Sequence, residues 1–283
     1  MPGSLPKSTR YVSSPMKSDL KPSILLTALS AVFLTTSQAA IIDVARYHLG
    51  EAGSLNGPNN IPQDSLSTDT FGGLFINGGT PTSTIVPAST VALNLGTVPT
   101  GYYSATGNGV FGASTLGPAP DNFGVEIFVN AVAGQGDNVF LTTTGTTLAT
   151  VGGLIFEIRS GNWDVAVPGF DYIGAVLGAG QPANPGWTSL AVIRNTGIST
   201  LYINGVAQPR TSGAQPTFDP NFHLGVTPGG GSWFRGDMDE LHIFTFNPLT
   251  DNPASFLTPV PEPGAAALFI GALAALARRR RGC

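Results

Sequence analysis

Three neighbouring carboxylates form the densest group of residues that could do chemistry. They are Asp237, Asp239 and Glu240, in a segment that alternates polar and apolar residues as a strand does. On a strand, Asp237 and Asp239 would point to one face and Glu240 to the other. Retaining glycosidases need two carboxyl groups about 5–5.5 Å apart, one as nucleophile and one as acid. Glycoside hydrolysis is therefore an alternative, but we expect these residues to support the strand and expect no catalytic residue.

Loop carboxylates and amides offer a second chemistry, the binding of calcium. No fixed ligand spacing joins these residues, so we expect solvated loop acids and no metal site, and we keep calcium as an alternative cofactor. The residues concerned are Asp64, Asp69, Asp121, Asn122, Asp137 and Asn138.

Other reactive residue types lack the spacing that chemistry requires. His48, His223 and His242 are scattered, and no paired motif such as H-E-x-x-H joins them, so a zinc site is not expected. The G-x-S-x-G motif of serine hydrolases is absent from the sequence. The glycines at 229–231 precede Ser-Trp, without the Lys and helix of a phosphate-binding loop, and therefore predict a hairpin loop.

Four aromatic residues flank or occupy glycine-rich segments: Trp163, Trp233, Tyr102 and Tyr103. Amphipathic rings of this kind suit the faces of sugars or contacts with proteins. We predict them as candidate ligand contacts, with packing in the core or at its rim as the alternative for each ring.

Charge and cysteine content exclude several classes of partner. Residues 40–259 hold five Arg, no Lys and 15 Asp and Glu, which gives a net charge near −10. Such a surface repels phosphates, so nucleic-acid binding is excluded. The one cysteine is Cys283, so this region contains no disulfide, and its roughly 220 residues can bury a core without one.

The elements that must position these residues are short β-strands. Glycine and proline together make up 60 of the 283 residues, and turn-forming clusters separate the apolar segments. Residues 50–88 and 177–186 are expected to be long surface loops. The predicted strands span 41–49, 90–95, 123–132, 138–144, 154–159, 171–176, 187–195, 198–203, 222–226 and 237–246.

The clearest local pattern lies in residues 187–208. Asn195-Thr-Gly197 and Asn204-Gly205 supply tight turns, the second of type I′, between alternating apolar residues. Leu190 and Val192 share one strand face, as Leu201 and Ile203 do on the next strand. These residues predict three antiparallel strands.

The order of motifs resembles the concanavalin A-like, or laminin-G-like, jelly-roll superfamily. The resemblance rests on a strand that begins with Trp187, the hairpin at 201–206, the segment 223–225 and the closing segment 236–244, with 44–51 as the first strand. It implies an all-β, two-sheet antiparallel sandwich, one sheet concave, over residues 40–249. The concave sheet of this fold commonly binds sugars.

The N-terminal segment, residues 1–39, has the pattern of a secretory signal peptide. Lys17 and Lys21 precede the apolar residues 24–34, and Ser37 and Ala39 precede a cleavage site before Ala40. Eleven residues of helix cover only about 16 Å, too little to cross a bilayer. Signal peptidase is therefore an expected partner, with Met16 as an alternative start to Met1.

The C-terminal segment, residues 260–283, resembles the PEP-CTERM sorting signal of bacterial envelope proteins. Three parts occur in order: a Pro-Glu-Pro motif, the apolar residues 264–277 and a basic cluster, and residues 250–259 precede them as a linker. The motif is Pro261, Glu262 and Pro263, and the cluster is Arg278, Arg279, Arg280 and Arg281. Four Arg after an apolar segment hold that end in the cytoplasm.

The apolar segment is 14 residues long, or about 21 Å as a helix, and is short for a permanent transmembrane helix. The resemblance implies a transient inner-membrane anchor and an exosortase-type protease as processing partner. We therefore expect an exported protein of the cell envelope or extracellular space. Its expected function is non-catalytic binding, with carbohydrate, especially exopolysaccharide, as the leading ligand and a structural or protein-interaction role in the matrix as the alternative.

The sorting prediction can be tested in the producing cell. Replacement of residues 261–263 by Ala should leave the C-terminal tail attached, because the processing enzyme would no longer recognise it. Mass spectrometry of the exported protein measures this, and unchanged removal of the tail would contradict the prediction.

Overall fold

The computed structural model describes the central part of the chain, which belongs to a compact unit of residues 39–283. The predicted signal peptide and sorting signal lie outside the described residues. Among the residues that are described, no helix is long and apolar enough to cross a membrane. The described residues are 42–51, 55–56, 61–62, 65–66, 80–83, 86, 89, 91–96, 103–105, 120–143, 152–169, 171–173, 182–218, 222–227 and 231–257.

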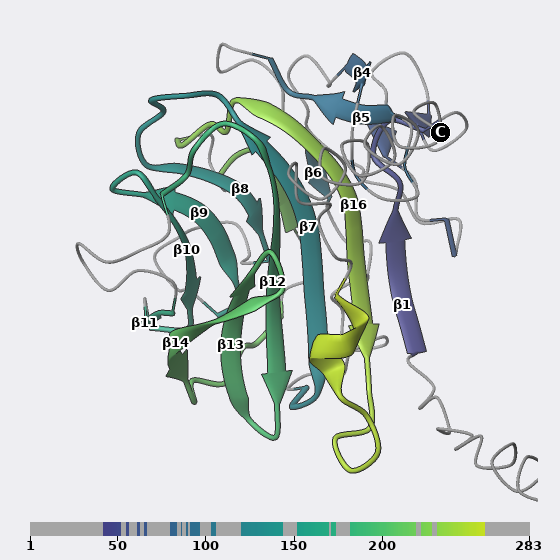
Figure 1. Ribbon diagram of the computed structural model, residues 1–283, viewed down its shortest axis with the longest axis vertical. Helices are drawn as coiled ribbons and strands as arrows, with labels where there is room; N and C mark the ends of the chain where they lie inside the picture. Colours follow the sequence, from purple (N-terminus) through teal and green to yellow (C-terminus); the bar gives the residue numbers. More distant parts are fainter. Residues whose placement is uncertain are drawn as a thin grey trace, which may run out of the picture. The chain divides into compact units, whose positions relative to one another are not determined.

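Two antiparallel sheets build this unit (Figure 1), as the sequence predicts. We call the larger one sheet I. In order across it lie β14 (Val206–Ser212), β13 (Ile198–Ile203), β12 (Trp187–Asn195), β7 (Phe123–Ala131), β16 (Gly236–Thr245), β5 (Val91–Asn94) and β4 (Thr80–Ser83), and β1 (Ile42–Tyr47) also pairs with β16.

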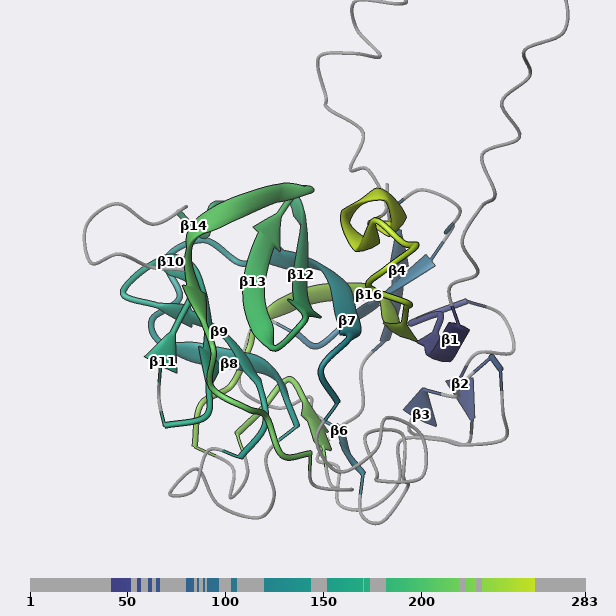
Figure 2. The ribbon, with the colours of Figure 1, turned by 90° about the horizontal axis from the view of Figure 1, so that it is seen from below.

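Sheet II is the smaller sheet and faces sheet I. In order across it lie β11 (Asp171–Tyr172), β10 (Asn162–Val167), β9 (Ile155–Arg159), β8 (Asn138–Thr142), β15 (Phe222–Leu224) and β6 (Tyr103–Ala105). A separate pair joins β2 (Leu55–Asn56) to β3 (Ile61–Pro62). The view along the strands shows the two sheets as layers (Figure 2). This confirms the all-β sandwich.

The structure confirms the three-stranded pattern of residues 187–208. β12 and β13 occupy the predicted ranges, and Leu190 pairs with Ile203 in register. Both connecting turns contain two consecutive residues with positive φ, Thr196 (46°) with Gly197 (81°) and Asn204 (51°) with Gly205 (77°). Two such residues are what a type I′ turn requires, so the twist of the turns matches that of the strands.

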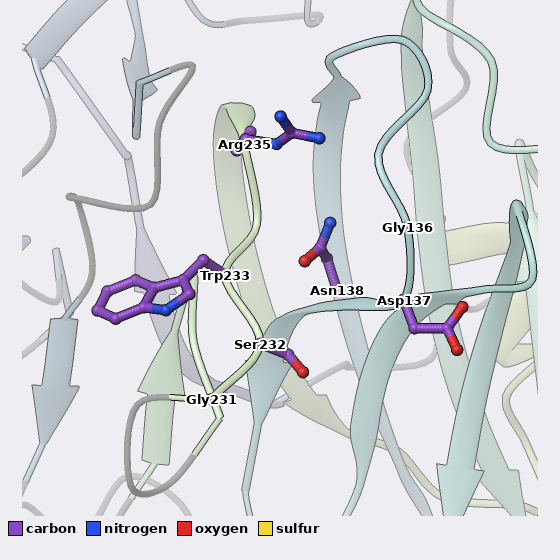
Figure 3. Close-up of a pocket in the computed structure, with 7 residues that line it drawn as sticks. All are labelled: Gly136, Asp137, Asn138, Gly231, Ser232, Trp233 and Arg235. Carbon is purple, nitrogen blue, oxygen red and sulfur yellow. The ribbon is translucent and has the colours of Figure 1, made fainter.

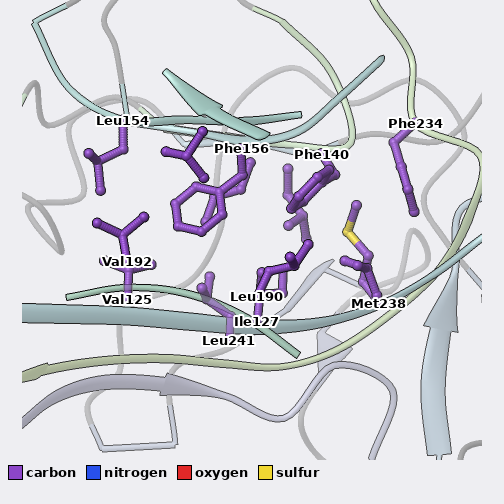
Figure 4. Packing of buried hydrophobic residues seen from close by; sticks show 14 of the residues in the cluster. Val125, Ile127, Phe140, Leu154, Phe156, Leu190, Val192, Phe234, Met238 and Leu241 are labelled. Atoms are coloured by element: carbon purple, nitrogen blue, oxygen red, sulfur yellow. The ribbon is translucent and has the colours of Figure 1, made fainter. Parts of the chain in front are cut away.

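Alternating residues of the two sheets meet in one core (Figure 4). Sheet I contributes Val125 and Ile127 of β7, and sheet II contributes aromatic rings. The ring of Phe140 lies at the centre, with centroids 6.0, 5.8 and 5.6 Å from those of Phe156, Trp163 and Phe234, all three at steep angles. Edge-to-face contacts of this kind add to the free energy gained by burial.

β16 is the strand around which sheet I is arranged. β7 pairs along one of its edges, while β5 and β1 share the other, with β5 at residues 237–238 and β1 at 241–245. A register shift falls between Asp239 and His242, where Glu240 has a φ of 46°. This bulge separates the two partners of that edge.

A 3₁₀ helix, η1 (Pro253–Phe256), covers part of the outer face of sheet I, the face that points away from sheet II (Figure 2). Leu257 and Phe244 belong to the same buried cluster. Residues 250–259 were expected to form a linker, but the packed part of the domain extends to Leu257, because these apolar side chains are buried against the sheet.

An exposed ion pair bridges two edges of the sandwich. Arg210 of the edge strand β14 lies with Nη2 2.6 Å from Oδ1 of Asp171 in β11, the edge strand of sheet II. Pro209 precedes Arg210 in β14 and has no N–H to offer to a further strand.

The loop prediction for residues 50–88 was wrong in part, since β2, β3 and β4 lie there. β10 was also missed; it follows β9 after a two-residue turn of Ser160 and Gly161, both with positive φ. Several predicted strands are shorter in the structure; β11 contains only residues 171–172 of the predicted 171–176.

Gly124 provides a test of packing on the outer face. An added Cβ there would lie only 2.1 Å from Cζ of Phe244, and that ring cannot move away freely because Phe246 and Phe256 surround it. Gly124→Ala should lower the free energy of unfolding by about 1–3 kcal/mol, measured by urea denaturation.

Gly213→Ala is the matched control, because its nearest neighbour is 3.8 Å away and its φ is not positive. It should change stability little. Equal losses in the two variants would contradict this account of the packing.

Candidate functional site

A pocket of about 310 Å³ opens between two loops at one end of the sandwich. One loop, residues 132–137, joins β7 to β8, and the other precedes β16. The residues that line the pocket are Gly136, Asp137, Asn138, Gly231, Ser232, Trp233 and Arg235 (Figure 3). Most of these groups are polar, so the pocket suits a ligand with hydrogen-bonding groups.

Gln135 fixes the two loops to each other. Its Nε2 donates to the carbonyl oxygen of Arg235 (2.8 Å), and its Oε1 accepts from the backbone N–H of Arg235 (3.0 Å). The backbone N–H of Val132 also donates to Arg235 O (3.0 Å). Gln135 is buried, so these bonds are protected from water and preorganise the pocket.

The second loop is held by the side chains of Thr227 and of Asn138 in β8. Thr227 Oγ1 accepts from the backbone N–H groups of Gly231 (2.9 Å) and Ser232 (3.1 Å). The side-chain amide of Asn138 lies 2.7 Å from the carbonyl oxygen of Trp233. The hairpin predicted around residues 229–231 agrees with the bridge between Val226 and Trp233 that closes it.

The pocket contains one cation and one anion. Asp137 Oδ1 accepts from the backbone N–H of Ser160 (2.6 Å), which orients this carboxylate but leaves its negative charge in the pocket. The side chain of Arg235 is half-buried, and within the described part of the chain its guanidinium forms neither a hydrogen bond nor an ion pair. Its donors are therefore available to a ligand.

The predicted aromatic contacts lie in different places. Trp233 lines the pocket, with its indole extending away from Asp137 (Figure 3). Trp163 is 2% exposed and packs in the core against Phe140. Tyr102 lies outside the described residues, and Tyr103 belongs to β6. Of the three predicted aromatic residues that the structure describes, only Trp233 lines the pocket.

Asp237 is the centre of a polar ladder on the outer face of sheet I. Its Oδ1 accepts from Nδ2 of Asn94 (2.5 Å) and its Oδ2 from Nδ2 of Asn130 (3.0 Å). The two amide oxygens accept from the backbone N–H groups of Gly96 (2.8 Å) and Gly186 (2.9 Å). The ladder joins β5, β16 and β7, so Asp237 contributes to the cohesion of the sheet.

The other two carboxylates of this segment have separate environments. Asp239 is fully buried, and its Oδ1 accepts from the backbone N–H of Glu240 (2.9 Å). Glu240, at the bulge, lies with Oε1 2.5 Å from Nδ1 of His48. Glu240 was expected to point to the face opposite Asp237 and Asp239. Because the bulge interrupts the alternation, Leu241 and not Glu240 occupies the core side.

The candidate calcium ligands are occupied by protein contacts where the structure describes them. Asp121 pairs with Arg194, and Asn122 Oδ1 accepts from the backbone N–H of Thr196. Asp64 and Asp69 lie outside the described residues. No group of three or more His, Cys, Asp or Glu suited to a metal ion occurs among the described residues.

The histidines remain apart from the pocket. His242 Nε2 lies 2.8 Å from Asp43 Oδ1, and burial lowers the pKa of His242 although this contact with Asp43 opposes the shift. His223 lies in β15.

Sequence reasoning missed Glu157, whose pKa departs furthest from its ordinary value among the described residues. Burial, and then repulsion from the adjacent Asp164, raise the pKa of its carboxyl to about 7, although Arg159 opposes the shift. Asp164 is paired with it across β9 and β10, and Asp137 of the pocket adds to the same repulsion. Only the register of two strands creates this contact, so the sequence alone offers no signal for it.

The raised pKa predicts a pH dependence of stability. The folded state binds the Glu157 proton more tightly than the unfolded state, so this stabilisation is present at low pH and is lost as the pH rises through about 7. As the pH rises from about 5 to about 8, the free energy of unfolding of Glu157→Gln relative to that of the wild type should therefore increase by on the order of 2 kcal/mol. Urea denaturation at each pH measures this difference.

Asp171→Asn is a control of opposite sign. A hydrogen bond from Ser212, and then Arg210, lower the pKa of Asp171. The stabilisation that the Asp171 carboxylate contributes is therefore constant above the ordinary pKa of the group and is lost as the pH falls into the acid range. A Glu157→Gln difference that stays constant over the same pH interval would contradict the shift.

Comparison with known proteins gives a family and several structural neighbours. No curated protein matches the chain. Domain 4 of AbnA, an extracellular arabinanase from Geobacillus stearothermophilus solved with arabinotriose, has a TM-score of 0.46 and 19% identity, covering 74% of this chain and 96% of that one. The ligand-binding domain of botulinum neurotoxin serotype D, solved with N-acetylneuraminic acid, has a TM-score of 0.45 and 12% identity, covering 72% and 48%.

A family model described as the concanavalin A-like lectin/glucanases superfamily matches residues 103–252, more than half of the sequence. The match includes both pocket loops and most strands of the two sheets. The chain belongs to the concanavalin A-like lectin/glucanases superfamily.

Proposed function

We propose that this protein is an exported, non-catalytic module that binds carbohydrate in the pocket beside Arg235. The observation that carries the proposal is a preorganised polar pocket whose one cation has no partner within the described part of the protein. Fold alone does not fix function, and this superfamily includes both binding and cleaving proteins by name. The proposal therefore depends on the site.

Of the two charged groups in the pocket, Arg235 favours a sugar that carries an acidic group, while Asp137 can accept hydrogen bonds from sugar hydroxyls. A guanidinium binds carboxylate and sulfate oxygens through two parallel N–H donors. The hydroxyl of Ser232 and the ring of Trp233 add a polar and an apolar contact, the combination that sugar rings present. Residues 40–259 are strongly acidic overall and would repel an anionic polymer elsewhere, so Arg235 would confine the contact with such a polymer to the pocket.

The arrangement of the carboxylates supports binding without catalysis. Asp237 is bound by two asparagine amides, and Asp239 is enclosed. A retaining glycosidase needs two carboxyl groups that both reach the substrate. Glu240 belongs to an ion pair with His48 instead.

Export and sorting are part of the same proposal and rest on the sequence. Residues 1–39 would direct the domain out of the cytoplasm, and residues 260–283 would anchor it briefly in the inner membrane before an exosortase-type protease removes the tail. A domain delivered in this way meets the polymers of the envelope, so an acidic exopolysaccharide is the proposed ligand.

Affinity electrophoresis of the full chain tests the proposal. Gels that contain alginate or polygalacturonate should retard the wild type, and Arg235→Gln should weaken this retardation by about tenfold in apparent affinity because a charge-assisted contact is lost. Arg210→Gln is the matched control, since it removes the same charge from an exposed pair whose residues do not line the pocket.

Equal losses in the two Arg variants would show only a general effect of charge and would overturn the site. Absence of retardation in every acidic and neutral gel would overturn carbohydrate binding and favour the matrix or protein-interaction role. Release of sugar by the wild type, lost in Asp237→Asn, would favour the glycosidase alternative.

A further inference from the structure

We infer that the outer face of sheet I carries a second carbohydrate-binding surface, for a neutral sugar. It consists of Trp187, Asn130, Asp237 and Asn94, which we call the Trp–Asn–Asp–Asn row. This inference extends the proposed carbohydrate binding to a different ligand chemistry and to residues outside the pocket.

Strand register brings these four residues into line. Trp187 of β12 pairs with Asn130 of β7, Asn130 pairs with Asp237 of β16, and Asp237 pairs with Asn94 of β5. Directly opposed residues of neighbouring strands point to the same face. Their sequence neighbours Val129, Ala131, Leu93, Leu95 and Met238 belong to the core, so the row lies on the opposite, outer face.

The row remains accessible where the rest of this face is closed. All four of its side chains are half-buried. The next row along the same strands, Ser189, Phe128 and Asp239, is at most 1% exposed, and further on η1 covers Phe244. The outer face is therefore open at the end that bears the row.

The hydrogen bonds of the ladder leave paired donors and acceptors. Each oxygen of Asp237 accepts one amide N–H, which leaves it lone pairs, and each asparagine NH₂ group donates one of its two N–H groups to Asp237. A donor beside an acceptor matches two adjacent sugar hydroxyls, which can each donate and accept. Because the amide oxygens are held by the backbone of Gly96 and Gly186, the orientation of these groups is fixed before a ligand arrives.

Charge and aromaticity define the ligand class. Asp237 places a carboxylate at the centre of the row, which disfavours an acidic sugar. Trp187, at the end of the row, offers a half-exposed indole on which the apolar face of a pyranose or furanose ring can stack. The row thus fits a neutral sugar unit, in contrast to the pocket with Arg235.

Affinity electrophoresis in gels of neutral polysaccharide (arabinan, xylan or laminarin) tests the row. The full chain should be retarded in at least one of these gels. Trp187→Ala should reduce the apparent affinity about five- to tenfold, since stacking on the ring is lost, while Trp187→Phe should retain most of it. Ile198→Ala is the matched control, because Ile198 is 46% exposed on the same face of sheet I, far along β13 from the row.

A second measurement separates binding from a loss of folding. In a Trp233→Phe variant, the emission of Trp187 should change on titration with the oligosaccharide of the retarding polymer, and this change should vanish in Trp187→Phe/Trp233→Phe. Trp163 remains in both variants as an internal reference, because it is buried in the core.

The outcomes distinguish the two proposals. Retardation in neutral gels that Trp187→Ala leaves unchanged, or an emission of Trp187 that does not respond, overturns the row while leaving the pocket intact. Retardation in acidic gels alone also overturns the row. Loss of acidic binding in Arg235→Gln together with loss of neutral binding in Trp187→Ala supports both sites.

Discussion

The structure depends on one constraint: β16 changes its pairing partner from β5 to β1 along one of its edges. One edge of this strand follows β7 along almost its whole length, while the other is shared by β5 and β1. The exchange requires the bulge at residues 239–240, where Glu240 adopts a positive φ and is held by His48. Before the bulge, Asp237 is aligned with Asn94 of β5 and Asn130 of β7, and after it His242 contacts Asp43 of β1.

The bulge also decides which carboxylates reach the surface. Without it, regular alternation would place Glu240 on the core side, where an ionised group would be costly. With it, Leu241 fills the core and Glu240 pairs with an imidazole. A segment that reads as a cluster of three acids is thus divided among a ladder, an enclosed position and an ion pair.

Much of the fold could be predicted from the sequence, because its signals are local. The strands 187–195 and 198–203 and the turns between them depend on residues a few positions apart, and the glycines and asparagines that permit positive φ are visible directly. The sites depend on pairing across the chain. Asn94 and Asp237 are 143 residues apart, and Gln135 and Arg235 are 100 apart. Trp233 was found because an aromatic residue beside glycines is a local pattern, whereas the value of Trp187, Asn130 and Glu157 arises only from register.

The edge of the sandwich at β14 affects how readily molecules would aggregate at high protein concentration. β14 ends sheet I with Pro209 and with Arg210 bound to Asp171 of β11. A strand of another molecule that paired with β14 would lack the backbone N–H donor at Pro209 and would meet the Arg210 side chain, which is paired with Asp171. Edge-to-edge addition of further molecules to sheet I is thus disfavoured at this strand.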